Sequence, residues 1–270
     1  MLDSELISDI ARQLDAAEQD ASQIGQLSLA HPDMQMADSY AIQNAWLQIK
    51  LNRGLTVRGH KIGLTSRAMQ QAVGIDEPDY GFLTNDMFLD DAAQIDTARL
   101  IEPRIEAELA FIMAEDLSGP DCTLHDVLEA TAYVTPALEL LDARIQRSDP
   151  ANGRRRTVLD TVADNAANSA IICGGLMVRP MDIDLRRASV IALRNGIVEE
   201  TGVAAGVLNH PANGIAWLAN RLAPWGVSLK KGQVILSGSF IRPIDARAGD
   251  TFTADYGPLG TVSCHFSARA

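Results

Sequence analysis

The sequence predicts an α+β protein in which a helical N-terminal segment precedes a β-rich domain. Apolar residues recur every three or four positions through residues 1–55, which is typical of helices that bury one face. From about residue 57 onward, short apolar runs alternate with glycine, proline and aspartate, which is typical of strands and turns. The 270 residues, 47% of them hydrophobic, can bury a large core. We therefore expect a helical segment over residues 1–55 and a second domain over residues 56–270.

The apolar spacing places the N-terminal helices more closely. One helix is predicted over residues 2–14 and a second over residues 37–51, with the segment LSLAHPDM as their connection. Further along the chain, a helix is predicted to begin near Pro211 and to stop before Pro224, because proline suits the first turn of a helix and not its interior.

Two local signals mark elements in the second domain. Thr123 and Asp126 have the spacing of a capping box, which predicts a helix start, and we expect Pro136 to end that helix and to begin a strand. Asn195 and Gly196 lie between two apolar runs, and this dipeptide is a strong signal for a two-residue hairpin turn. The second domain is therefore expected to mix helices with several short strands.

Charge and composition exclude several classes of function. The formal net charge of −12, from 35 acids and 23 bases, would repel phosphate backbones, so we expect no nucleic-acid partner. The acidic N-terminus does not resemble a signal peptide. The sequence contains no run of about 18 apolar residues, the length that a membrane-spanning helix needs. The three cysteines form no CxxC pair, which argues against a disulfide framework and a thiolate zinc site. We expect a soluble, cytoplasmic protein.

The segment EPRIEAELAF places two acids side by side. If it is a strand, Glu106 and Glu108 share one face, because side chains two positions apart point the same way. A third acid, Glu139, lies in the apolar run VTPALELL, where an unpaired charge is costly. Acids without histidine or cysteine suit Mg²⁺ or Mn²⁺. The alternative is that Glu106 and Glu108 lie on a solvated sheet face and that Glu139 pairs with Arg144.

Two further residues are candidates for catalysis. Lys61 lies in GHKIGLTS, where a desolvated lysine can exchange a proton or hold an anion, although a strand lysine at the surface is the simpler interpretation. Asp79 lies between Pro78 and Gly81 in an expected turn, where it either exchanges protons or hydrogen-bonds its own backbone.

Two polar segments are candidates for substrate binding. Thr161 belongs to LDTVADNAANSA, which is either a loop facing the substrate or a helix start with good caps. Ser239 belongs to SGSF, whose hydroxyls and amides can grip a carboxylate, although an ordinary strand end fits equally well. No dinucleotide fingerprint, phosphate-binding loop or serine-nucleophile motif is present in the sequence.

Several segments follow one another in a characteristic order. They are GHKIGLTSRAMQ, EPDYG, EPRIEAELAF, PALELLDARI, DTVADNAANSA and GVLNHPANGIAWLANRLA. In this order the chain, from about residue 30 to its end, resembles the hydratase and decarboxylase branch of the fumarylacetoacetate hydrolase superfamily. That branch is found in bacterial meta-cleavage pathways for aromatic compounds.

The resemblance implies a fold and a site. The fold would be a mixed, rolled β-sheet with flanking helices, as in the C-terminal domain of fumarylacetoacetate hydrolases. The site would hold Mg²⁺, with Mn²⁺ as an alternative, through Glu106, Glu108 and Glu139. Lys61 and Asp79 would have catalytic roles.

The resemblance also implies a reaction. EPDYG, RRRTVLDT and ETGVAAGVLNHPANG are most similar to members that hydrate 2-oxohept-4-ene-1,7-dioate, in homoprotocatechuate degradation. A small-molecule 2-oxo dicarboxylate is thus the expected partner, and the loop around Thr161 would contribute to its site. Arg154, Arg155 or Arg156 would hold the second carboxylate, although a solvated basic loop is the alternative. Oligomers are common on this scaffold, and we expect a homo-oligomer.

Other functions remain open at this stage. The same scaffold would serve a 4-oxalocrotonate decarboxylase or a 2-hydroxypentadienoate hydratase. An acylpyruvate hydrolase would need a water-activating group such as His31, whose surrounding motif does not look like that group. From a different class, the chain could be a non-catalytic scaffold subunit of a pathway complex.

Overall fold

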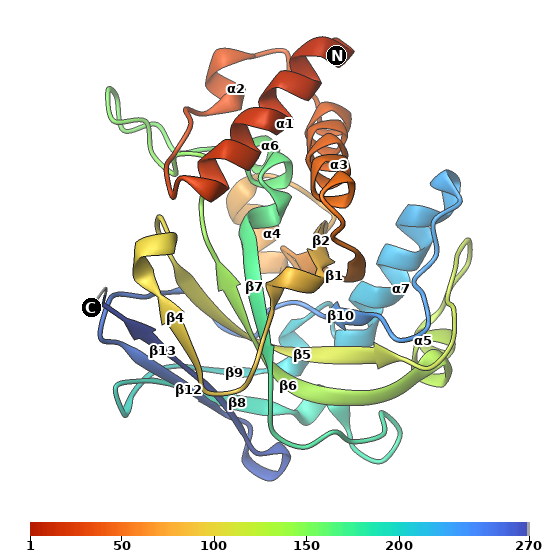
Figure 1. Ribbon diagram of the computed structural model, residues 1–270. Helices are drawn as coiled ribbons and strands as arrows, with labels where there is room; N and C mark the ends of the chain where they lie inside the picture. Colours follow the sequence, from red (N-terminus) through yellow and green to blue (C-terminus); the bar gives the residue numbers. More distant parts are fainter. Residues whose placement is uncertain (269–270) are drawn as a thin grey trace.

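Helices form the N-terminal part of the chain. The computed structural model describes residues 1–268, apart from the side chains of residues 72 and 73. Its N-terminal helices are α1 (Ser4–Gln19), α2 (Leu27–Ala30) and α3 (Met36–Asn52), which lie together above the strands in Figure 1. The two expected helices are confirmed as α1 and α3. The expected connection between them contains the short helix α2.

The strands form two sheets. The larger sheet contains β1 (Val57–Gly63), β2 (Asp79–Thr84), β3 (Phe88–Leu89), β5 (Arg104–Met113), β6 (Thr131–Leu141), β7 (Asn168–Cys173), β10 (Val234–Leu236) and β11 (Ile244–Asp245). Its order is β2-β1-β10-β5-β6-β7-β3, with β11 beside β5. The smaller sheet has the order β4 (Ala93–Asp96), β13 (Thr261–Ser267), β12 (Thr251–Asp255), β8 (Ser189–Arg194) and β9 (Ile197–Val203). Parallel pairs, such as β1 with β10, occur beside antiparallel ones, so the sheets are mixed.

The remaining helices connect these strands. They are α4 (Arg67–Val73), α5 (Leu124–Ala130), α6 (Val158–Ala163) and α7 (Pro211–Leu222). Short 3₁₀ helices lie at Asn85–Met87, Thr97–Arg99, Asn165–Ala167, Leu185–Arg187, Ala204–Gly206, Ala223–Trp225 and Gly257–Leu259. The long strands β5 and β6 curve across the larger sheet in Figure 1. The expected α+β class, with a helical segment followed by a mixed, curled sheet, is confirmed.

One element boundary differs from its prediction. Thr123 and Asp126 do form the capping box of α5, but the helix ends at Ala130, and Pro136 lies inside strand β6. The β-branched and aromatic segment TAYVT favours a strand over a longer helix. The Pro136 carbonyl accepts a hydrogen bond from Gly174, just beyond the end of β7, so the missing proline N–H faces that side and leaves the β5–β6 ladder complete.

The predicted hairpin is confirmed. Asn195 and Gly196 connect β8 to β9, with φ angles of 54° and 78°. Two successive positive φ angles are the requirement of a type I′ turn, which asparagine and glycine meet at little steric cost.

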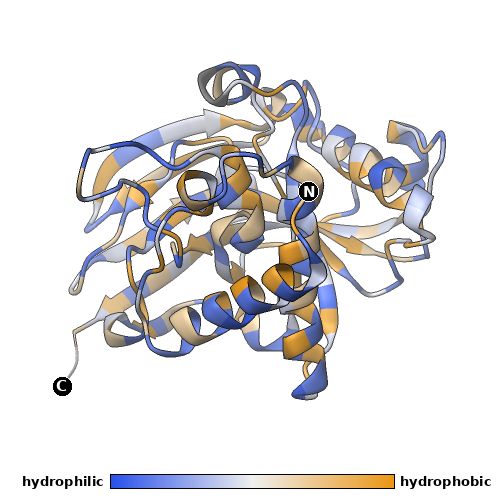
Figure 2. Ribbon diagram, turned by 90° about the horizontal axis from the view of Figure 1, so that it is seen from above, coloured by the Kyte–Doolittle hydropathy of each residue, from blue (hydrophilic) through white to orange (hydrophobic). Residues whose placement is uncertain are grey.

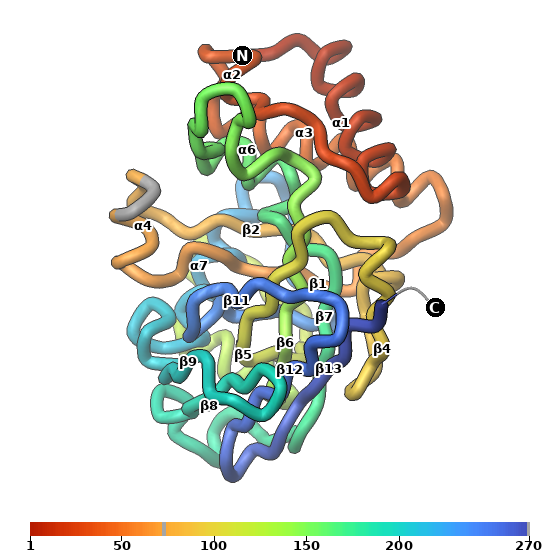
Figure 3. The backbone as a smooth tube through the Cα atoms, turned by 90° about the vertical axis from the view of Figure 1, so that its left-hand side faces the viewer, coloured from red at the N-terminus to blue at the C-terminus, as the bar shows by residue number. Residues whose placement is uncertain are grey.

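The N-terminal helices share a core with the larger sheet. Ile10 and Trp46 belong to the same buried cluster as Phe82 of β2 and Ile171 of β7. Figures 1 and 3 both place α6 beside these helices, far from them in sequence. The division into residues 1–55 and 56–270 stays a prediction.

None of the helices that the structure describes is long and apolar enough to cross a membrane. Seen from above in Figure 2, the helices alternate hydrophobic and hydrophilic residues along their length. This alternation is typical of helices that bury one face against a protein core.

Candidate active site

Three glutamates meet at the centre of the β5–β6 pair. The antiparallel register places Glu106 opposite Glu139, and Glu108 shares the face of Glu106. One carboxylate oxygen of each glutamate lies within 4.8 Å of the others. Glu108 and Glu139 are fully buried, so a solvated sheet face is wrong. Arg144 pairs with Asp164 at 2.6 Å, which also removes the alternative pairing of Glu139 with Arg144.

Neighbouring groups satisfy only part of these carboxylates. The Gly238 amide donates to Glu108 Oε2 at 2.7 Å, and Asn168 Nδ2 donates to Glu139 Oε1 at 2.9 Å. Glu108 Oε1 and Glu139 Oε2 are buried with no hydrogen-bond partner among the residues described. Oxygen atoms that lack donors and converge on one point suit a hard divalent cation. The residues present therefore fit a metal ion.

The electrostatics of the cluster point the same way. Burial, followed by the charge of Glu139, raises the pKa of Glu106 to about 8 and raises the pKa of Glu108 well above its usual range. Ionised carboxylates this close repel strongly where water does not screen them. A bound cation would remove that repulsion.

Lys61 lies beside the glutamates and not at the surface. Its side chain on β1 is buried, and Nζ donates to the Ala166 carbonyl at 3.3 Å and lies 3.3 Å from Glu139 Oε1. Burial alone would lower the pKa of Lys61, but the charges of Glu139 and Asp79 outweigh it and raise that pKa. The ammonium group therefore stays charged at neutral pH.

Asp79 reaches the same place from the next strand. It begins strand β2, opposite Gly63 of β1, and does not lie in the expected turn. Its side chain is buried, and its Oδ1 has no hydrogen-bond partner within the described part of the chain. A Cβ atom at residue 63 would lie 2.2 Å from Asp79 Oδ1 and 3.2 Å from Lys61 Nζ, so the glycine makes this approach possible. Burial raises the pKa of Asp79 despite the nearby Lys61, which favours its protonated form.

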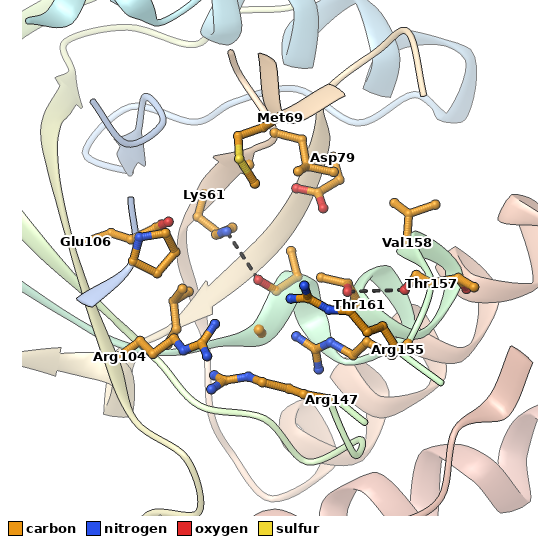
Figure 4. A pocket seen from close by; sticks show the side chains of 17 residues that line it. Lys61, Met69, Asp79, Arg104, Glu106, Arg147, Arg155, Thr157, Val158 and Thr161 are labelled. Atoms are coloured by element: carbon orange, nitrogen blue, oxygen red, sulfur yellow. Dashed lines mark hydrogen bonds between the residues drawn. The ribbon is translucent and has the colours of Figure 1, made fainter. Parts of the chain in front are cut away.

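A pocket of about 600 Å³ opens over these groups. Figure 4 shows Lys61, Asp79 and Glu106 in one part of it and arginine side chains in the other. The arginines that line it are Arg104, Arg147, Arg155 and Arg156. The pocket thus has a carboxylate end and a guanidinium end.

The predicted substrate-binding residues differ in position. Thr161 of α6 lines the pocket, and its hydroxyl donates to the Thr157 carbonyl at 3.3 Å. Ser239 and Arg154 are not among the residues that line it. The Ser239 hydroxyl donates to the Ile241 carbonyl at 2.9 Å, and Arg154 is exposed to solvent. The segment SGSF was expected to bind a carboxylate of the substrate. In the structure the backbone amide of Gly238, in this segment, instead donates to the carboxylate of Glu108.

Two arginines that line the pocket, Arg104 and Arg147, were not predicted from the sequence. Arg104 stands two positions before Glu106, so the alternation that aligned the glutamates could have placed it on the same face. Arg147 lies between β6 and α6, where no periodic pattern predicts a direction. His31, which a hydrolase would need, is not among the lining residues.

Comparisons with solved structures identify the fold. The 4-oxalocrotonate decarboxylase from Pseudomonas putida G7, complexed with magnesium and adipate, superposes with a TM-score of 0.93 at 35% identity, covering 98% of this chain and 99% of that chain. A fumarylpyruvate hydrolase from Pseudomonas aeruginosa, at 13% identity, has a TM-score of 0.61 over 80% of this chain and 91% of its own. The fold is that of the fumarylacetoacetate hydrolase superfamily.

Comparisons of sequence narrow this class. A 2-oxo-hept-4-ene-1,7-dioate hydratase from Escherichia coli is 55% identical over 98% of this chain and its own full length. A 2-hydroxyhexa-2,4-dienoate hydratase from Comamonas testosteroni is 38% identical over 99% of this chain and its own full length. No protein-family model matches the sequence. The chain belongs to the hydratase and decarboxylase branch of the fumarylacetoacetate hydrolase superfamily.

Proposed function

We propose that the protein is a hydratase, a hydro-lyase that adds water to a 2-oxo-alkenoate. The proposed substrate is 2-oxohept-4-ene-1,7-dioate, and the product is 4-hydroxy-2-oxoheptane-1,7-dioate. The observation that carries the proposal is the 55% identity, over almost the whole chain, with a hydratase of that name. The reaction belongs to the catabolism of aromatic compounds, and we propose the homoprotocatechuate pathway in particular.

Glu106, Glu108 and Glu139 are the proposed ligands of a divalent metal ion. Mg²⁺ is our first choice and Mn²⁺ the alternative, because oxygen ligands without histidine or cysteine suit these ions. The decarboxylase relative contains magnesium in one structure and calcium in another. When bound, a divalent metal would supply Lewis-acid stabilisation of negative charge at the oxo-acid end of the substrate.

Lys61 and Asp79 have separate proposed roles. The Lys61 ammonium, kept charged by its acidic neighbours, binds and orients the substrate carboxylate. Asp79, whose raised pKa favours a carboxylic acid, moves the proton that the alkene carbon needs. The net reaction places OH on C4 and H on C5, which together are one water molecule. Thr161 lines the space in which the chain of the substrate would lie.

A turnover assay tests the proposal. Purified protein with Mg²⁺ should consume 2-hydroxyhepta-2,4-diene-1,7-dioate, and the loss of absorbance of this compound measures the rate. The product should be heavier than the substrate by the mass of one water molecule. Asp79→Asn removes the proton carrier and should lower kcat about 100-fold or more while the fold persists. An Asp79→Asn enzyme with normal kcat would reject the role of Asp79, and an inactive wild type would reject the hydratase.

A decarboxylase is the second candidate. The TM-score of 0.93 with 4-oxalocrotonate decarboxylase favours it, as does 37% identity with a decarboxylase from Pseudomonas sp. strain CF600. Release of CO₂ from 2-oxohex-3-ene-1,6-dioate, measured beside hydration of the seven-carbon dioate, separates the two reactions. Faster CO₂ release would make the protein a decarboxylase.

We also propose that the protein is a homo-oligomer. Strand β9 ends the smaller sheet, and three of its aliphatic side chains are exposed: Ile197, Val198 and Val203. Exposed apolar side chains along a sheet edge favour association. Light scattering on the purified protein measures its mass directly.

A further inference from the structure

One end of the pocket concentrates positive charge in an acidic protein. The chain has a net charge of −12, yet four arginines line this single pocket. In Figure 4 the side chains of Arg104, Arg147 and Arg155 point toward one common space below Lys61. Arg156 also lines the pocket. Such a gathering of like charge favours a site for an anion.

The arginines repel one another. Burial, followed by the charges of Arg104 and Arg156, lowers the pKa of Arg147 to about 10. The nearest acidic group for Arg147 is Glu102, whose carboxylate lies 3.5 Å from Nη1 and is itself partly exposed. The charges of Glu102 and Asp142 act in the opposite direction but do not offset the burial and the repulsion. An anion placed among the guanidinium groups would.

The four side chains are not equally free to bind a ligand. Arg104 donates to Asp245 at 2.6 Å, and Arg156 lies 3.4 Å from Asp164. Arg155 forms no ion pair within residues 1–268. Arg155 therefore has the most donors available. Arg147 donates through Nη2 to the Glu102 carbonyl at 2.9 Å, which leaves its Nε and Nη1 groups for a ligand. Arg104 and Arg156 are held in place by the protein and contribute their charge.

Strand geometry places one of the arginines close to the glutamates. Glu106 and Arg104 lie two positions apart on β5, so they share a face and their Cα atoms are roughly 7 Å apart. The carboxyl carbons of an extended seven-carbon dioate are separated by roughly 7 to 8 Å, given carbon–carbon bonds of about 1.5 Å. An extended seven-carbon dioate is therefore long enough to reach from the glutamates to neighbouring side chains of the pocket.

We infer that Arg147 and Arg155 bind the distal carboxylate of a dicarboxylate substrate, with Arg104 and Arg156 supporting them. The oxo-acid head of the substrate lies at the glutamate end. That the substrate carries an oxo-acid head rests on the proposed function. Bidentate contacts between guanidinium and carboxylate groups then make the chain selective for oxo dioates over oxo monoacids.

Binding calorimetry in Mg²⁺ tests the inference without turnover. The ligands are 2-oxoheptanedioate and 2-oxopentanoate, which share the oxo-acid head and lack an alkene. The proteins are wild type, Arg147→Met and Arg155→Met, with Arg187→Met as the control because the Arg187 side chain is 87% exposed on a different segment. Each pocket variant should bind the dioate about tenfold more weakly and the monoacid as wild type does. The control should match wild type for both ligands.

The outcomes separate this inference from the proposed function. Unchanged monoacid binding shows that a variant is folded. Variants that bind the dioate as wild type does, or that weaken both ligands equally, overturn the inference. Turnover of 2-hydroxyhepta-2,4-diene-1,7-dioate is measured separately, and its absence in wild type rejects the hydratase whatever the calorimetry gives.

Discussion

Glu106, Glu108 and Glu139 are held close together by the ladder of β5 and β6, against their mutual repulsion. Burial removes the water that would screen them, so the site costs stability when no cation is bound. Such a cost is typical of binding sites, where function and stability compete. Binding of the proposed metal ion would offset that cost.

Glu108→Gln tests this competition. Removal of one of three like charges should leave the thermal midpoint of the metal-free protein equal to or above that of wild type. Mg²⁺ at saturating concentration should raise the midpoint of wild type by several degrees, because a ligand that binds only the folded state stabilises it. The same addition should hardly change the midpoint of Glu108→Gln. Glu129→Gln, an exposed acid on α5, is the control, and equal Mg²⁺ responses in both variants would contradict the assignment.

Gly63 is expected to be as important for activity as Lys61 and Asp79, because only a glycine leaves room for these two side chains to approach. In Gly63→Ala the new methyl group would meet Asp79 Oδ1 and displace that carboxyl. We expect kcat to fall about 100-fold, because small misplacements of a catalytic group have large effects. Gly25→Ala is the control, since no atom lies within 4 Å of its new methyl group. Similar kcat values for both alanine variants would show that the position of Asp79 is not critical.

His60 predicts a pH dependence of stability. Burial lowers its pKa to about 4, whereas an unfolded histidine has a pKa of about 6.5. Between these values the unfolded chain binds a proton that the folded protein does not, so stability falls as the pH falls through this window. Between pH 7 and pH 5, wild type should lose about 2 kcal/mol more unfolding free energy than His60→Asn. Parallel losses in urea titrations would contradict a desolvated, neutral His60.

At the scale of elements, short local signals decide where helices and strands begin. The capping box of α5 is exposed, and Thr123 exchanges hydrogen bonds with Asp126, including one from the Thr123 amide at 2.7 Å. Thr123→Ala should lower the unfolding free energy by about 1 kcal/mol, with kcat unchanged. Thr123→Ser keeps the hydroxyl and should stay close to wild type. A loss as large in the serine variant would show that the hydroxyl is not the stabilising group.

Patterns along a single element were easier to predict than contacts between elements. The alternation in β5 aligned Glu106 with Glu108, but Glu139 joins them through the register with β6, which the resemblance supplied and periodicity did not. Pro136 was misplaced because it was expected to end the helix, whereas the β-branched and aromatic residues before it already form strand β6. Of the three expected arginines, Arg155 and Arg156 line the pocket and Arg154 does not, because the direction of a side chain in an irregular loop depends on tertiary contacts.

At the scale of the whole molecule, the pocket is assembled from distant parts of the chain. Its residues come from β1, α4, β2, β5, β6 and α6, from the segment between β6 and α6, and from the 3₁₀ helix that follows α6. Ser28 of α2 donates to Asp160 of α6 through its amide and its hydroxyl, at 2.8 and 2.6 Å, so the N-terminal helices support the helix that carries Thr161. The fold therefore brings a carboxylate end and a guanidinium end to one cavity.

Anomalous diffraction from crystals grown with MnCl₂ tests the central claim most directly, because Mn²⁺ scatters anomalously and binds the same oxygen ligands as Mg²⁺. We expect one strong anomalous peak between the carboxylates of Glu106, Glu108 and Glu139. A map without a peak there, or with its strongest peak elsewhere in the pocket, would contradict it.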